Sequence, residues 1–165
     1  MVPNHFYPAT VALCLAAVVA AYFCNNPLKH DRRFIVRRFI NWFPLGMTYA
    51  FLYMGRYNLN VSKNALGTLM SKEDFGLIFA AGTVTYAVSF LINGPLIDKK
   101  IGGKNGILVA ALGASFANIP LGILTYLITA RGLKTNVVAA FSLLYSVNMY
   151  FQSYGAVSII KVKSY

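Results

Sequence analysis

The chain has 165 residues, of which 58% are hydrophobic and 12% are charged, and its mean hydropathy is +0.58. A soluble domain carries about 25% charged residues, so this composition excludes an ordinary soluble fold and predicts an all-α polytopic membrane protein whose partner is the lipid bilayer. The formal net charge of +11 comes from short basic clusters between apolar runs, which sets membrane topology and argues against a nucleic-acid partner.

Five apolar runs are long enough to cross a bilayer, which requires a helix of about 20 residues. The second of them contains one charge, Arg56. The segments between the runs are too short to fold as a separate domain. We therefore expect five transmembrane helices, within residues 7–23, 39–61, 75–97, 105–130 and 135–160. The sequence Ser-Lys-Glu-Asp at 71–74 predicts the start of the third helix, because it combines a capping residue with acids in the first turn.

The first run leaves two alternatives open, an uncleaved anchor helix and a cleaved secretory signal. It lacks the basic residues that precede the apolar part of a signal peptide, which favours the anchor. Its basic cluster follows it instead, at Lys29, Arg32, Arg33, Arg37 and Arg38. We therefore expect an anchor helix over 1–28, a basic cytoplasmic linker over 29–38 and a helical bundle over 39–165.

The distribution of lysine and arginine predicts the orientation of the chain. If 29–38 is cytoplasmic, then the loop 98–104 and the C-terminus are also cytoplasmic, and these three segments hold most of the basic residues. The N-terminus and the two remaining loops then lie outside, in a cell membrane or inner membrane.

Polar residues of the second run fall on one helical face. Tyr49, Tyr53, Arg56 and Asn60 follow the spacing i, i+4, i+7, i+11. A guanidinium beside two phenols suits a small organic anion, because arginine grips phosphate and carboxylate with two parallel hydrogen bonds. The alternative is that Arg56 snorkels to the outer membrane interface.

Other runs carry polar or small residues at helical spacing. In the last run, Asn148 and Gln152 lie on one face with Tyr145, and buried amides there either hold helices together or line a path. The third run has a weaker polar side, formed by Thr83, Tyr86 and Asn93. The fourth run has a face of small residues that predicts close helix packing, at Gly106, Ala110, Gly113, Ala114 and Ala117.

The loop after the third run reads Gly-Pro-Leu-Ile-Asp-Lys-Lys-Ile-Gly-Gly-Lys over residues 94–104. It resembles the cytoplasmic signature of the major facilitator superfamily, which joins transmembrane helices two and three. The resemblance implies a conformational role for the loop, in which Asp98 pairs with basic residues or caps a neighbouring helix and so latches one state. The residues that match are Gly94, Asp98, Lys99, Gly102 and Lys104.

More narrowly, residues 38–165 resemble the organophosphate:phosphate antiporters, the glycerol-3-phosphate and hexose-phosphate type. The resemblance rests on the pattern Tyr49, Tyr53, Arg56 and Asn58, the 94–104 loop and the sequence Tyr-Phe-Gln-Ser-Tyr-Gly at 150–155. It implies that Arg56 is the phosphate ligand, that the two tyrosines line the cavity and that Gln152 lies near it. Two lysines found in members of the family are replaced here, by Tyr57 and Phe90, which leaves another organic anion open.

The superfamily's unit has two six-helix halves with the binding site between them. We therefore expect a partial N-terminal half, four core helices with one additional N-terminal helix, whose parent exchanges an organic phosphate by alternating-access antiport. The missing remainder of that transporter is then a required partner. The alternative is a truncated membrane protein that does not transport and serves as a scaffold or as a partner of a full transporter. The chain has four acidic residues and none inside a run, so we expect no catalytic residue, metal or cofactor.

Overall fold

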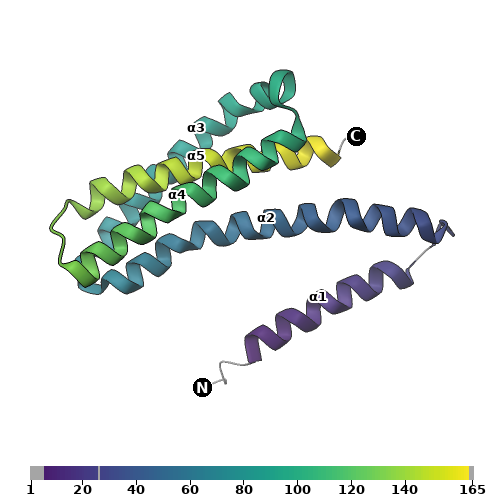
Figure 1. Cartoon of the computed structure of the whole chain (residues 1–165), viewed down its shortest axis with the longest axis horizontal. Helices are drawn as coiled ribbons and strands as arrows, with labels where there is room; N and C mark the ends of the chain where they lie inside the picture. Colours follow the sequence, from purple (N-terminus) through teal and green to yellow (C-terminus); the bar gives the residue numbers. More distant parts are fainter. Residues whose placement is uncertain (1–5, 26, 164–165) are drawn as a thin grey trace. The chain divides into compact units, whose positions relative to one another are not determined.

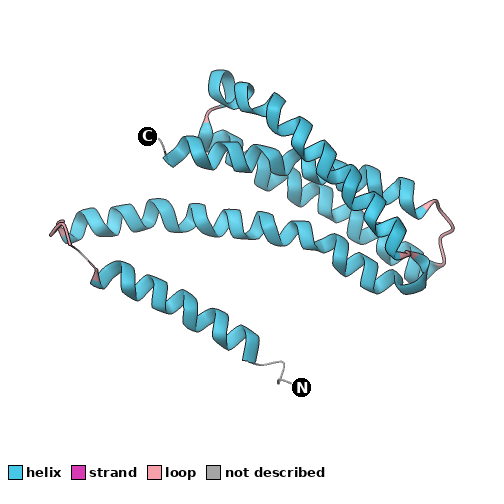
Figure 2. Ribbon diagram, turned by 180° about the vertical axis from the view of Figure 1, so that it is seen from behind, coloured by secondary structure: helices cyan, strands magenta, loops and turns pink. Residues whose placement is uncertain are grey.

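The computed structural model describes residues 6–25 and 27–163, and in this part of the chain it contains helices and loops without strands (Figures 1 and 2). This confirms the all-α prediction. The helices and turns, in chain order, are α1 (Phe6–Cys24), α2 (Arg32–Leu66), the 3-10 turn Gly67–Leu69, α3 (Lys72–Leu96), the π-helical turn Ile97–Ile101, α4 (Gly103–Arg131) and α5 (Val137–Lys163).

Two of these helical segments are long and apolar enough to cross a membrane by length and composition, Lys72–Ile101 and Gly103–Arg131. Ala9–Cys24 is a shorter apolar helix. α2 and α5 are also long, at 35 and 27 residues, but arginines in α2 and amides in α5 make them less apolar. The count of five spans therefore stays a prediction.

The chain divides into two compact units, Met1–Pro44 and Leu45–Tyr165. The division falls inside α2, at a proline, which has no backbone N–H and crowds the preceding helical turn. α2 begins at Arg32, so most of the segment 29–38, predicted as a linker, is helical. Arginine is a good helix former, which accounts for the early start.

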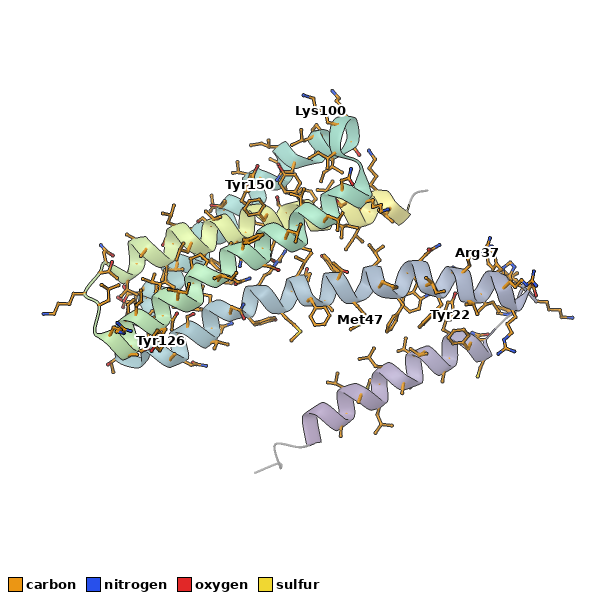
Figure 3. The ribbon with its side chains drawn as sticks, viewed as in Figure 1. Tyr22, Arg37, Met47, Lys100, Tyr126 and Tyr150 are labelled. Carbon is orange, nitrogen blue, oxygen red and sulfur yellow. The ribbon has the colours of Figure 1, made fainter. Side chains whose placement is uncertain are left out.

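In the first unit, aromatic rings join α1 to the beginning of α2. The Tyr22 ring centroid lies 5.3 Å from that of Trp42 and 5.7 Å from that of Phe39, and Phe23 lies 5.0 Å from Phe39. The Tyr22 hydroxyl donates a hydrogen bond to the Ile35 carbonyl, at 3.2 Å. Figure 3 shows Tyr22 between the two helices. The unit is thus a hairpin held by side chains.

In the second unit, α3 and α4 pack against α5. The small-residue face predicted for the fourth run is confirmed, since Ala110, Ala114 and Ala117 are buried. A Cβ added at Gly113 would lie 2.1 Å from the Phe151 ring, so the helices approach as closely as glycine allows. The predicted start of the third helix is also confirmed, because the Ser71 hydroxyl accepts from the Asp74 amide at 3.0 Å and the Asp74 carboxylate accepts from the Ser71 amide at 2.9 Å.

The outward faces of this bundle are apolar. Large side chains such as Leu91 on α3, Phe116 on α4 and Leu143 on α5 are at least two-thirds exposed within the chain. A monomer in water rarely presents this much apolar surface, whereas a bilayer covers it at no cost. The second unit therefore has the surface of a membrane-embedded bundle.

Candidate functional site around Arg56

The second unit brings the polar faces of α2 and α5 together. Arg56 is half-buried, and its Nε donates a hydrogen bond to Oε1 of Gln152 at 2.5 Å. Gln152 Nε2 in turn donates to Oδ1 of Asn148, also at 2.5 Å. Both amide side chains are almost fully buried, at 1% and 0% exposure. The two amides therefore hold the guanidinium from one side and fix its orientation.

Two tyrosine rings flank the same guanidinium. Cζ of Arg56 lies 4.5 Å from the ring centroid of Tyr53 and 4.6 Å from that of Tyr86. Each ring face attracts the cation by roughly 0.5–2 kcal/mol, depending on its exposure. The Tyr49 hydroxyl donates to the Tyr53 hydroxyl at 3.3 Å, which joins Tyr49 to the group. The planar guanidinium thus contacts two aromatic rings.

Tyr86 was not predicted as a site residue. It comes from α3, and the sequence showed it only as part of the weak polar side of the third run. The signal was its helical spacing from Thr83 and Asn93. This spacing places Tyr86 on one face of its helix but does not identify the helix that this face contacts. Asn93 takes another role, because its side chain donates to the Ser153 hydroxyl at 2.7 Å and joins α3 to α5.

The Arg56 charge has no acidic partner among the described residues. The ion pair found in this part of the chain joins Asp98 to Lys161. The groups around Arg56 are an amide and two phenols, and none of them is a carboxylate. A charge inside a membrane-spanning bundle is costly unless an opposite charge or water meets it. Within the described residues, the guanidinium thus lies among uncharged polar and aromatic side chains.

Between the start of α5 and Gln152, two buried polar atoms have no hydrogen-bond partner among the described residues, Nδ2 of Asn148 and the hydroxyl of Tyr145. An unsatisfied buried donor costs about 1–3 kcal/mol, so water or a ligand oxygen is the expected partner. Both residues lie on the face of α5 that carries Gln152. The polar surface near Arg56 thus continues into the bundle.

Asn60, the last residue of the predicted stripe, is exposed on α2. The contacts that Arg56 makes in the described part of the chain do not include it. The structure therefore gathers Tyr49, Tyr53, Arg56, Asn148 and Gln152, adds Tyr86, and leaves Asn60 aside.

The residues of the 94–104 loop form a separate arrangement. Asp98 Oδ1 lies 2.9 Å from Nζ of Lys161 on α5, and the same ammonium donates to the carbonyls of Asp98, at 2.8 Å, and Ile97, at 3.3 Å. Gly102 has a φ of +76°, which favours glycine and lets the chain turn into α4. Gly94 lies within α3, and Lys99 and Lys104 are exposed. The loop is thereby tied to the end of α5.

No family model matches the chain, and no solved structure matches it. A curated protein, the "Membrane sensor protein UhpC" of Salmonella typhimurium, is 24% identical to it over 139 residues. The match covers 80% of this chain and 29% of that protein, so the chain spans less than a third of the relative's length. Together with the two apolar helices, it supports a distant relation to a membrane protein.

Proposed function

We propose that this chain forms the anion-binding side of a major-facilitator-like membrane transporter or sensor, and that Arg56 binds a sugar phosphate or a related organic anion. The observation that carries the proposal is the half-buried guanidinium of Arg56, held by Gln152 and two tyrosines with no carboxylate beside it in the described chain. The distant similarity to a membrane sensor protein supports the same class of function.

The chemistry follows from how Arg56 is held. Among the described residues its hydrogen bond is made through Nε, so the two terminal amino groups remain for a ligand. A phosphate or carboxylate fits two parallel N–H donors, and Tyr53 and Tyr86 keep the guanidinium plane in one orientation. The hydroxyl of Tyr53, which accepts from Tyr49, supplies a further donor on α2.

Two modes of action are proposed for this site. In the first, the chain is one side of an antiporter that works by alternating access, and the remainder of the transporter supplies the other side. The second is binding without transport, as a sensor or as a partner of a full transporter. The similarity to a protein named as a membrane sensor favours the second mode.

The proposal is tested by titrating the full chain, in lipid nanodiscs, with a hexose phosphate and with the corresponding neutral hexose. We expect only the phosphate to bind. Arg56→Gln should weaken binding by about 10- to 100-fold, which corresponds to losing charged hydrogen bonds of about 1.5–3 kcal/mol. Arg56→Lys should also weaken binding, since lysine keeps the charge and loses the planar pair of donors.

The matched control is Arg131→Gln, which removes the same charge from the exposed end of α4 and should leave the affinity unchanged. Equal affinity of wild type and Arg56→Gln would remove Arg56 from the site. Uptake of labelled hexose phosphate into vesicles then separates the two modes. Uptake supports the transporter, and binding without uptake supports the sensor.

A further inference from the structure

The first unit contains a cavity of about 520 Å³ between the C-terminal end of α1 and the start of α2. Its lining combines apolar side chains, among them Val18, Leu28 and Phe34, with the cationic side chain of Arg38 and the ring of Trp42. Asn25, His30 and Tyr22 also line it, so a cation and a few polar groups lie beside apolar side chains, a combination that fits an amphiphile. It lies wholly within residues 1–44 and is therefore a different site from that of Arg56.

The charge around the cavity is strongly positive. Five basic residues lie within 29–38, at Lys29, Arg32, Arg33, Arg37 and Arg38, against one acid, Asp31. Basic residues that directly follow an apolar helix attract the anionic lipids of the cytoplasmic leaflet by about 1 kcal/mol each. The charge thus favours an anion over a zwitterion or a cation.

The cavity also contains an unpaired hydrogen-bond donor. Nε1 of Trp42 is buried and has no acceptor among the described residues. Its neighbour Tyr22, with ring centroids 5.3 Å apart, already uses its hydroxyl on the Ile35 carbonyl. A buried indole N–H normally finds an acceptor, and a phosphate or ester oxygen in the cavity would supply one. Tryptophan and tyrosine are also the residues that gather at headgroup depth.

We propose that this cavity binds one anionic phospholipid, with its phosphate on Arg38 and its acyl chains along α1. The apolar side chains of α1 favour a lipid over a soluble phosphate as the ligand, because Val11, Leu13 and Val18 are more than half exposed within the chain. A soluble anion would leave this surface and the apolar cavity wall uncovered. An acyl chain covers both.

Trp42 is the single tryptophan of the chain, so its fluorescence reports on this cavity without a label. The full chain is reconstituted in phosphatidylcholine nanodiscs that contain increasing fractions of brominated phosphatidylglycerol, whose bromines quench a nearby indole. The reference measurement uses brominated phosphatidylcholine in place of brominated phosphatidylglycerol. We expect half-maximal quenching at a clearly lower fraction of brominated phosphatidylglycerol than of brominated phosphatidylcholine.

Two single variants distinguish a specific lipid site in the cavity from non-specific attraction of anionic lipids to the basic segment. Arg38→Gln, in the cavity wall, should raise the fraction of anionic lipid needed by about fivefold, the equivalent of about 1 kcal/mol. Arg37→Gln removes the same charge from the neighbouring position, which is exposed and outside the cavity lining, and should change it little. Arg38→Lys keeps the charge, so it should retain most of the preference for the anionic lipid. A retained preference would also show that substitution at this position does not unfold the helices.

Three results would overturn the proposal. Equal quenching by the two brominated lipids would mean that Trp42 senses only the bilayer. Equal effects of Arg37→Gln and Arg38→Gln would mean diffuse attraction without a site. Displacement of phosphatidylglycerol by millimolar inorganic phosphate would identify a soluble anion as the occupant. Failure of the proposed anion binding at Arg56 would not affect these outcomes, because the measurement reports on Trp42 alone.

Discussion

The orientation of Arg56 depends on neutral neighbours. A carboxylate at the position of Gln152 would neutralise the guanidinium permanently, whereas the amide holds Nε at 2.5 Å and leaves the charge in place. As a result, Arg56 has no carboxylate counter-ion among the residues that the structure describes. Such an arrangement is stable when the missing charge arrives with a ligand. If Arg56 binds an anion as proposed, the amide at Gln152 is the residue that keeps the guanidinium charge available.

This view predicts opposite effects for two substitutions of Gln152. Gln152→Glu places a carboxylate against Arg56, and we expect the affinity for an organic phosphate to fall by at least about tenfold while the thermal stability does not fall. Gln152→Met removes the acceptor without adding charge, so the protein should lose about 1–3 kcal/mol of stability. Anion titration and thermal unfolding of both variants in nanodiscs test the pair. Wild-type affinity in Gln152→Glu would show that the anion does not compete for the guanidinium.

At the scale of the helices, glycine and alanine residues at the contacts determine how closely the helices pack. Ala110 and Ala114 of α4 are buried, and a Cβ at Gly106 would lie 2.0 Å from the Ser158 hydroxyl of α5. On α3, a Cβ at Gly82 would lie 2.3 Å from the ring of Tyr145. In a membrane, where lipid is as apolar as leucine, this close packing is the main force that holds helices together.

Two glycines of α3 offer a matched test of this packing. Gly82→Ala should destabilise the protein by about 1–3 kcal/mol, because the buried ring of Tyr145 must move. Gly76 has no atom within 4 Å of an added Cβ and lies exposed on the same helix, so Gly76→Ala should stabilise it by about 0.5–1 kcal/mol. Unfolding in mixed micelles with increasing denaturing detergent measures both. Equal effects would show that α3 and α5 do not rely on this contact.

At the scale of the whole chain, local signals were predictable and cross-helix pairings were not. The apolar runs predicted the helices, the Ser-Lys-Glu-Asp sequence predicted where α3 begins, and small residues predicted the packed face of α4. The contact of Tyr86 with Arg56 and the choice of Lys161 as the partner of Asp98 were not predicted. Periodicity places a residue on a face of its own helix, whereas the rotation and contacts of that helix depend on packing throughout the bundle.

The charged residues of the second unit are distributed differently at its two ends. The Asp98–Lys161 ion pair places the basic 98–104 loop beside the end of α5, and Figure 3 shows Lys100 and Tyr126 toward opposite ends of the unit. The other end carries the loop between α4 and α5, with Arg131 and Lys134, and the acids of the α3 start. Because cytoplasmic loops concentrate lysine and arginine without many acids, the 98–104 end is the expected cytoplasmic side.

The orientation is tested with single cysteines in a chain whose native Cys14 and Cys24 are replaced by serine. We expect Lys100→Cys to be protected from a membrane-impermeant maleimide in intact cells, because it lies on the predicted cytoplasmic side. Lys134→Cys, which is exposed in the loop before α5, should be labelled under the same conditions. Permeabilised cells should label both and so serve as the accessibility control. The reverse pattern would invert the topology, and labelling of both in intact cells would mean that α4 does not cross the membrane.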